Sequence, residues 1–129
     1  MKWKLGEDYC ALGQEIEELR EEIANIWSLL KSPRRSGSAC HNDAMAEGVA
    51  TVVDLENVLE QKIQSYGELR LKVESVIEIF PSMERRLLRM RYIRRFTWTK
   101  IANRMYCDES TCRRMHRRLI RQLNESSHS

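Results

Sequence analysis

The chain has 129 residues and a formal net charge of +3, but this charge is distributed unevenly. Residues 1–78 hold nine Lys and Arg against fifteen Asp and Glu, whereas residues 79–129 hold thirteen against four. The resulting charges of −6 and +9 predict that the two halves have different tasks, one of which involves an anionic polymer. The length allows one ordinary domain or two small helical units, which argues against a large enzyme with a cofactor domain.

The composition favours a cytoplasmic, all-α protein. Gly and Pro together account for seven residues, about half the usual frequency, so long helices are expected rather than a strand-rich fold. No apolar run in the sequence approaches the roughly 20 residues of a membrane span, and the N-terminus, MKWKLGEDYC, becomes acidic where a signal peptide would be apolar. We therefore expect no membrane association, and free thiols at Cys10, Cys40, Cys107 and Cys112.

A heptad pattern predicts a first long helix within residues 1–31. Its apolar residues are separated by alternating steps of four and three, the spacing of a coiled-coil seam, at Leu5, Tyr9, Leu12, Ile16, Leu19, Ile23, Ile26 and Leu30. Because Gly6 and Gly13 weaken the early turns, we expect the firm helix to start after Gly13. Pro33 ends it, since the residue before a proline is driven out of the helical region.

Residues 32–43 have the composition of a linker, and residues 44–80 predict a second long helix that ends at Pro81. Asn42 or Asp43 is its expected N-cap. Ile63 and Ile77 are expected to widen its seam, which reads Met45, Gly48, Val52, Leu55, Leu59, Lys62, Tyr66, Leu69, Val73, Val76 and Phe80. The two helices are expected to fold back as an antiparallel, coiled-coil-like hairpin. In the alternative, both stripes meet a second copy and form a homodimer, and the heptads alone do not separate these arrangements.

Residues 81–124 predict a helix-turn-helix domain, followed by a disordered tail over residues 125–129. Its three short helices have expected N-caps at Ser82, Thr97 and Asp108. If Trp98 is the first position of the two-helix unit, Ala102 is the small residue that a close helix crossing requires. The remaining buried positions are then apolar or thiol: Ile101, Met105, Cys107, Cys112, Met115, Leu119 and Leu123. The bulky Tyr106 at the turn argues against a left-handed conformation there, so the turn is expected to differ from the tight repressor type.

The exposed face of this domain is rich in arginine and predicts contact with double-stranded DNA. Twelve of the thirteen basic residues after position 78 are Arg, whose planar guanidinium matches phosphate oxygens and guanine edges. No acidic residue occurs between Ser110 and Asn124, unlike in an ordinary solvated helix face. We expect the last helix to enter the major groove N-terminus first. Base-edge contacts are then expected from Glu109, Ser110, Arg113 and Arg114, with Thr111 also at the DNA, and phosphate contacts from Thr97, Thr99, Lys100, Arg104, Arg117 and Arg118.

The run RRLLRMRYIRRFTWTKIANRMYCDESTCRRMHRRLIRQL resembles region 4 of the sigma-70 family. The likeness lies in LLRMRYI, in a Thr-initiated helix with Ile101 and Ala102, and in a capped helix with Cys112, Met115 and Leu119 inside. The upstream run KSPRRSGSACHNDAMAEGVATVVDLENVLEQKI is similar to small phage and prophage regulators with a helical N-terminal half. The resemblance implies a helix-turn-helix that reads the promoter −35 element and touches the β flap of RNA polymerase.

The sequence also departs from the region 4 pattern. That pattern usually has Arg-Glu after the capping residue and a Gln further along, where this chain has Glu109, Ser110 and Arg114. The chain has no counterpart of region 2, which opens the promoter, so a complete sigma factor is not expected. The resemblance therefore implies a sequence-specific, DNA-binding transcriptional regulator of phage or mobile-element type that binds promoter DNA, alone or with RNA polymerase.

No enzyme chemistry, cofactor or metal site is expected. Cys107, Cys112 and His116 approach a metal-binding pattern, but a structural zinc site needs four ligands. The dense glutamates of residues 15–22 lie opposite the heptad seam, where a solvated face is expected. An alternative function is a helical adaptor whose acidic hairpin binds RNA polymerase or another partner, while the basic end attracts DNA without sequence preference.

Overall fold

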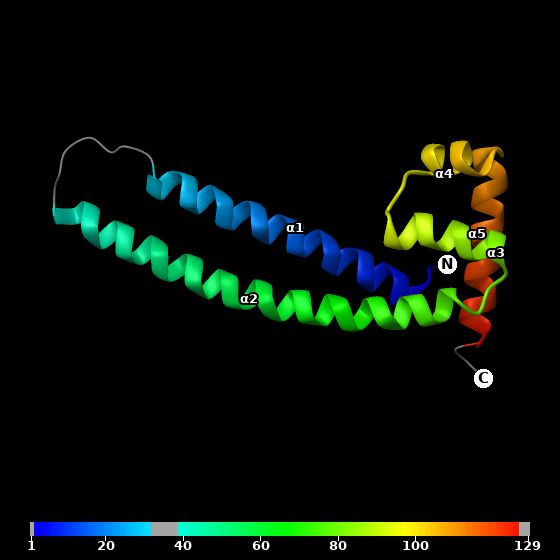
Figure 1. Ribbon diagram of the computed structural model, residues 1–129, viewed down its shortest axis with the longest axis horizontal. Coiled ribbons are helices and arrows are strands. Elements are labelled where there is room, and N and C mark those ends of the chain that lie inside the picture. Colours follow the sequence, from blue (N-terminus) through cyan, green and yellow to red (C-terminus); the bar gives the residue numbers. More distant parts are fainter. Residues whose placement is uncertain (1, 32–38, 127–129) are drawn as a thin grey trace. The chain divides into compact units, whose positions relative to one another are not determined.

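The computed structural model describes residues 2–31 and 39–126, with the side chains of residues 2–31 and 44–126, and this part of the chain is all-α (Figure 1). No strand occurs in these described residues, so the predicted fold class is confirmed. The elements are α1 (Lys4–Lys31), α2 (Ala39–Ile77), α3 (Ser82–Leu88), the π-helical turn η1 (Arg89–Ile93), α4 (Trp98–Met105) and α5 (Glu109–Ser126).

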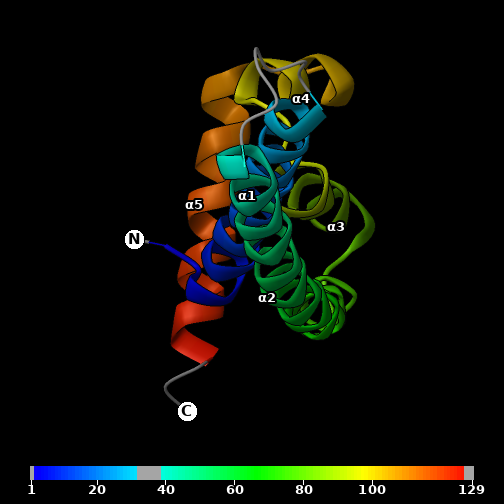
Figure 2. The ribbon, with the colours of Figure 1, turned by 90° about the vertical axis from the view of Figure 1, so that its left-hand side faces the viewer.

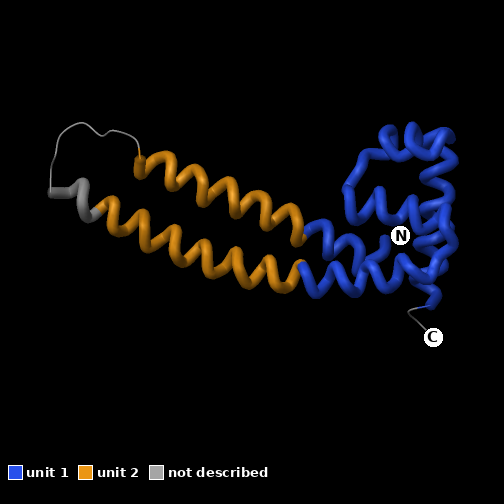
Figure 3. Tube along the Cα trace, in the orientation of Figure 1, with its two compact units in different colours: residues 1–11, 67–129 blue, residues 12–66 orange. Residues whose placement is uncertain are grey.

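The chain forms two compact units, and the boundary between them falls inside α1 and inside α2 (Figure 3). Unit 1 contains Met1–Ala11 and Gly67–Ser129, and unit 2 contains Leu12–Tyr66. The division at Pro81 expected from the sequence does not follow these units. The reason is a contact between distant parts of unit 1, where the rings of Trp3 and Tyr92 meet edge to face with centroids 5.0 Å apart.

Within unit 2, the segments of α1 and α2 lie side by side and run in opposite directions (Figure 3). Leu30, near the end of α1, lies against Gly48 near the start of α2. Lys62 Nζ is 3.3 Å from Glu15 Oε2, further back along α1. The core of this unit is formed by buried Leu19, Ile23 and Val52, with Ile26, Leu55 and Leu59 packed against them. The two heptad seams thus pack against each other within one chain.

The first helix begins earlier than expected. α1 starts at Lys4, so the prediction of a firm helix only after Gly13 is wrong. Each glycine lies directly beneath an aromatic ring, Gly6 below Trp3 and Tyr92, and Gly13 below Tyr66. The helix propensity of glycine is about 1 kcal/mol poorer than that of alanine, and the close packing of these rings on the backbone offsets that cost.

The bounds of α2 also differ from the predicted 44–80. The helix begins at Ala39, which places Asn42 and Asp43 inside it rather than at an N-cap. Residues 39–43 contain no Gly or Pro, so a helix that is already nucleated extends through them at little cost. The rest of the predicted linker, residues 32–38, lies outside the described residues. At the other end, Phe80 N donates to Ile77 O (3.1 Å), so the last turn tightens before Pro81.

The second seam is narrower than predicted. Val52, Val73 and Ile77 are buried, but Met45 is 37% exposed and Ile63 is 41% exposed. The predicted places of Met45 and Ile63 in the buried stripe are therefore wrong. A contact between only two helices covers a narrow strip of each, so apolar residues beside that strip face solvent.

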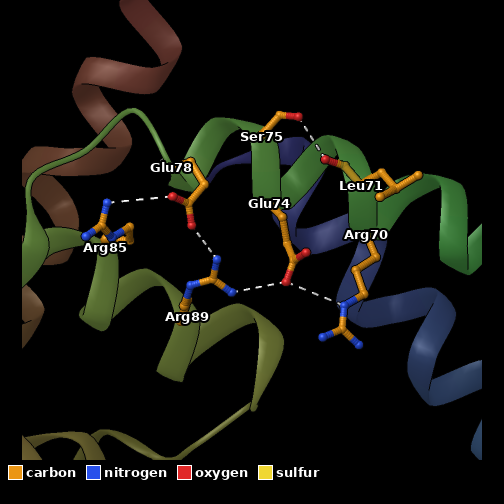
Figure 4. Close-up of polar contacts among 7 residues, drawn as sticks. All are labelled: Arg70, Leu71, Glu74, Ser75, Glu78, Arg85 and Arg89. Carbon is orange, nitrogen blue, oxygen red and sulfur yellow. Dashed lines mark hydrogen bonds and ion pairs between the residues drawn. The ribbon is translucent and has the colours of Figure 1, made fainter.

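Unit 1 is held together by a core from several helices and by an ion-pair network. Its fully buried side chains include Ile77, Leu87, Leu88, Ile101, Leu119 and Ile120. Arg89 donates from one nitrogen to Glu74 (3.0 Å) and from another to Glu78 (2.6 Å), which ties η1 to the end of α2 (Figure 4). Arg85 of α3 also lies 3.6 Å from Glu78. These contacts fix α3 and η1 against the end of α2.

Two predicted boundaries in the C-terminal part change. The N-cap of α3 is Pro81, whose carbonyl accepts from Arg85 N (2.9 Å), and Ser82 is the first helical residue rather than the cap. At the other end, α5 continues through Ser126, so the first two residues of the predicted disordered tail are helical. Residues 127–129 of that tail lie outside the described residues.

Candidate nucleic-acid interface

The start of α4 is fixed by a side-chain cap and by a cation. Thr97 has extended backbone angles, and its hydroxyl accepts from Lys100 N (3.2 Å), as predicted for an N-cap. Just before it, Phe96 N donates to Met90 O (2.9 Å), and Arg91 Nη1 donates to Phe96 O (3.1 Å). These bonds give hydrogen-bond partners to backbone groups in the irregular segment between η1 and α4. They fix the path of this segment and so the direction of α4.

The turn between α4 and α5 contains a left-handed residue. Tyr106 has φ 56° and ψ 42°, so the prediction that its bulk excludes this conformation is wrong. Its side chain is 94% exposed and meets no steric obstacle. Both Tyr106 N and Cys107 N donate to Ala102 O, a helix C-cap that offsets the cost of the left-handed backbone.

α4 packs against the N-terminal part of α5 (Figures 1 and 2). Of the positions predicted to be buried, Ile101, Ala102, Cys112 and Leu119 are buried, and Met105, Cys107, Met115 and Leu123 are half-buried. Ile120 is also buried, which the sequence pattern missed. This packing fixes the rotation of α5 about its axis, and so decides which of its residues face solvent.

All eleven residues predicted to contact DNA are exposed, and they lie on α4, its cap and α5. Two of them contact each other, because Thr99 Oγ1 donates to Glu109 Oε2 (3.2 Å). The other carboxylate oxygen of Glu109 is 3.7 Å from Arg113 Nη2. Glu109 therefore joins the start of α5 to α4 and orients Arg113, a positioning contact that the sequence pattern did not indicate.

Trp98 is the centre of a cationic cluster on this surface. The guanidinium carbon of Arg91 lies 4.5 Å from the centroid of the Trp98 ring, and that of Arg113 lies 5.6 Å away. A hollow of about 280 Å³ is lined by Arg91, Trp98, Arg113, His116 and Arg117. Stacking on the indole holds Arg91 and Arg113 near one another, and no acidic residue lines the hollow itself, so the hollow suits an anion.

A second aromatic ring gathers three more cations. Lys100 Nζ lies 4.1 Å from the centroid of the Phe96 ring, and the guanidinium carbons of Arg94 and Arg104 lie 5.1 and 5.2 Å from it. The carbonyl of Arg104 also accepts from Arg86 Nη2 (3.2 Å). Of these residues, only Lys100 and Arg104 were predicted as contacts. The sequence pattern did not indicate Arg91, Arg94 and Phe96, because the break before α4 interrupts the helical period. The one sequence signal for this cluster was an aromatic residue within a run of arginines.

Behind the exposed surface, His116 and Tyr92 form a polar link. His116 Nε2 lies 2.7 Å from the Tyr92 hydroxyl, and the Trp98 ring meets the imidazole edge to face at 5.1 Å. Burial, with a smaller effect from the charge of Arg91, lowers the pKa of His116 from 6.5 to about 4. Burial also raises the pKa of Tyr92. Both groups are therefore neutral at neutral pH, so His116 adds no positive charge to the cationic surface.

The cysteines of this region have a different arrangement from the one considered for a metal. Cys107 Sγ and Cys112 Sγ lie 3.1 Å apart, while the imidazole of His116 is turned toward Tyr92. Among the described residues, no three His, Cys, Asp or Glu side chains are grouped so that they could hold a metal ion.

Comparisons with known proteins place the chain in a family. No curated protein and no solved structure matches it. None of its described helices combines the length and the apolar character needed to cross a membrane. One family model matches residues 4–125, which is nearly the whole chain. The chain therefore belongs to the family described as "Protein of unknown function (DUF722)".

Proposed function

We propose that this protein is a cytoplasmic, sequence-specific DNA-binding regulator of transcription, of the sigma-70 region 4-like type found in phages and mobile elements. In this proposal α4 and α5 act as a helix-turn-helix, with α5 as the recognition helix in the major groove of promoter DNA. The proposal rests on the chemistry of one surface, and the sequence resemblance adds to it.

The observation that carries the proposal is a row of exposed arginines on α5 that have no polar partner within the described part of the chain. Arg114, Arg117, Arg118 and Arg121 are exposed on α5, and none forms a hydrogen bond or ion pair with another described residue. No acidic residue lies between Ser110 and Asn124 to neutralise them. Such unpaired guanidinium groups along one helix suit the regularly spaced phosphates and the guanine edges of duplex DNA.

The surrounding contacts divide the surface into two kinds of group. Lys100 and Arg104 lie beside the Phe96 ring, and we assign to them phosphate contacts that position the protein. Arg113, held between Glu109 and Trp98, is restricted in its motion before it meets DNA. A preorganised guanidinium loses less entropy on binding a base edge, so we expect Arg113 to contribute to sequence preference. We expect the same of Arg114 because it is the next exposed residue on the N-terminal part of α5.

The first experiment is the selection of bound sequences from a pool of random duplexes, with and without RNA polymerase. Six to ten phosphate contacts would lower the affinity about 10³–10⁵-fold between about 50 and 200 mM salt. Arg114→Ala should weaken binding to the selected duplex more than to random DNA, whereas Arg104→Ala should weaken both alike. Arg20→Ala serves as the matched control, because Arg20 is an exposed arginine of α1 in unit 2.

Two outcomes would overturn the proposal. One is the absence of any enriched sequence, with or without polymerase. The other is an equal loss of affinity from Arg20→Ala and Arg114→Ala, because the contact would then depend on overall charge rather than on α5.

A second candidate function, an adaptor that binds RNA polymerase through the acidic hairpin, is favoured by apolar exposure on unit 2. Trp27, Leu29, Val49 and Val53 are exposed there among many acidic residues. Binding of purified polymerase should then be weakened by the double variant Val49→Ser and Val53→Ser. Leu71→Ser is the control, since Leu71 is an exposed apolar residue of unit 1. Equal binding by both variants would exclude this surface.

A further inference from the structure

Two thiols lie in contact at the turn that leads into α5. Cys107 follows the left-handed Tyr106 and is half-buried, while Cys112, on the first turns of α5, is fully buried. Their sulfur atoms are 3.1 Å apart. The remaining described cysteine, Cys10, has its thiol near a backbone carbonyl instead, with Sγ 3.5 Å from Tyr92 O. Among the described cysteines, Cys107 and Cys112 are therefore the pair whose sulfur atoms are close enough to react with each other.

The distance between these sulfurs suits a covalent bond. A disulfide has an S–S length of about 2.05 Å, so the two atoms need to approach by about 1 Å from their separation of 3.1 Å. Side-chain rotation and a small shift of the turn can provide this approach. Tyr106 is 94% exposed, so its side chain does not obstruct a shift of the turn.

We propose that Cys107 and Cys112 are a modification site, at which a hydroperoxide converts the two thiols into an intramolecular disulfide. Cys107, the more accessible sulfur, attacks the peroxide oxygen and becomes a sulfenic acid, and its thiol proton ends on the released alcohol or water. The Cys112 sulfur then attacks the sulfenic sulfur. The S–S bond forms, the S–O bond breaks, and the hydroxyl leaves as water with the Cys112 proton.

The environment of the two sulfurs sets their order of reaction. Burial, together with the hydrogen bond to Cys107, raises the pKa of Cys112 to about 11. Cys112 therefore stays protonated near neutral pH and is a poor first nucleophile. A small hydroperoxide reaches half-buried Cys107 more readily than a bulky disulfide does, which is why we assign the peroxide as the oxidant.

The new bond would act on the proposed DNA contact, and this part of the inference rests on the proposed function. The disulfide would close a ring around residues 108–111, which include Glu109, Ser110 and Thr111. Drawing the sulfurs together strains the first helical bond of α5, Cys112 N to Asp108 O (3.1 Å), and the C-cap bond, Cys107 N to Ala102 O (3.1 Å). Oxidation should therefore displace the start of α5 and weaken specific DNA binding.

The chemical step is tested in the full chain carrying Cys10→Ser and Cys40→Ser, which leaves only the two thiols of interest. Hydrogen peroxide should lower the mass of the monomer by two hydrogen atoms, remove both thiols from alkylation and link the peptides that contain Cys107 and Cys112. Adding Cys107→Ser should abolish the linkage. If the background variant fails to fold, peptide mapping of the oxidised wild-type chain gives the same information.

The proposal is overturned if both thiols remain open to alkylation under conditions that oxidise a reference dithiol, or if the products are cross-linked dimers or sulfinic acids. The functional step is tested on a duplex obtained by selection. Oxidation should lower the specific affinity by about tenfold, the size of one lost base contact, and dithiothreitol should restore it, while Cys107→Ser should be unaffected by peroxide.

The two proposals fail in different ways. A disulfide that forms in a protein that binds no duplex in its reduced state would overturn the DNA-binding function and support the modification site. A disulfide that leaves the affinity for a selected duplex unchanged would overturn the regulatory effect alone.

Discussion

The imidazole of His116 lies between the Tyr92 hydroxyl and the Trp98 ring, beneath the arginines of the proposed interface. Its pKa is lowered from 6.5 to about 4, mainly by burial and further by Arg91. An unfolded chain therefore takes up a proton at this residue between those two pH values, whereas the folded chain does not. The stability that neutral His116 provides is complete above pH 6.5 and is lost as the pH falls toward 4.

We predict that the free energy of unfolding falls by about 1 kcal/mol between about pH 7.5 and about pH 5.5 because of this residue. Urea denaturation at several pH values measures the effect. In His116→Gln, which keeps a polar group opposite Tyr92 but does not titrate, the fall should be much smaller. An identical pH dependence in both proteins would assign it to other groups.

Two helical glycines offer a matched test of packing. An added Cβ at Gly6 would lie 2.5 Å from Trp3 Cε3 and 2.8 Å from the Tyr92 ring, whereas one at Gly67 would meet no atom within 4 Å. We predict that Gly6→Ala destabilises the protein by about 1–3 kcal/mol, because two packed rings must move. Gly67→Ala should stabilise it by about 0.5–1 kcal/mol, as alanine favours the helix. Thermal unfolding of both variants checks the opposite signs, and equal signs would contradict the packing described for Gly6.

At the scale of the elements, Arg89 fixes η1 to the end of α2 (Figure 4). Its guanidinium bridges two carboxylates, while Arg70 pairs with Glu74 only from within the same helix, at 3.6 Å. We predict that Arg89→Ala lowers the free energy of unfolding by about 1 kcal/mol, and Arg70→Ala by less than about 0.5 kcal/mol. Urea denaturation in low and high salt measures both. If both variants lost the same free energy of unfolding, the ion pairs of Arg89 would stabilise the fold no more than a pair within one helix. That result would contradict their role in joining η1 to α2.

The elements also separate what the sequence could predict from what it could not. Heptad spacing identified the faces of α1 and α2, because burial along a helix repeats with the helical period. The same period located Ile101, Cys112 and Leu119 in the core of unit 1. The buried face is a property of a single helix, so a local sequence pattern is sufficient to predict it.

Other features depend on contacts between distant residues, which no local pattern contains. Gly6 is accommodated in α1 because Tyr92 covers it. The left-handed backbone of Tyr106 is stabilised by a C-cap, and its side chain is exposed to solvent. Neither feature can be inferred from the size of the side chain. Within the candidate interface, the sequence pattern indicated residues on the helix faces of α4 and α5. It did not indicate Arg91 and Phe96, which lie where the backbone leaves the helical period.

At the scale of the whole molecule, the uneven charge of the two sequence halves is retained in the two compact units. Unit 1 has 17 Lys and Arg against nine Asp and Glu, a net charge of +8. Unit 2 has five against ten, a net charge of −5. If unit 1 meets DNA through α4 and α5, unit 2 repels the same polymer, and this repulsion restricts non-specific binding at the expense of affinity.

We predict that neutralising unit 2 raises the affinity for random duplex DNA. The exposed glutamates Glu21, Glu22, Glu56 and Glu60, all changed to Gln, should strengthen binding by about two- to fivefold at about 10 mM salt, where the Debye length is about 30 Å. The gain should shrink at about 100 mM salt, where that length is about 10 Å. Fluorescence anisotropy at both salt concentrations measures it.

The control changes the same four residues to Asp, which keeps the charge and alters the helix surface. An equal gain from the Asp variant would attribute the effect to helix structure rather than to charge. A gain that persists unchanged at the higher salt concentration would contradict long-range repulsion, because screening acts on charges separated by more than a Debye length. A gain confined to low salt and to the Gln variant would mean that the acidic unit limits non-specific attraction to DNA by long-range repulsion.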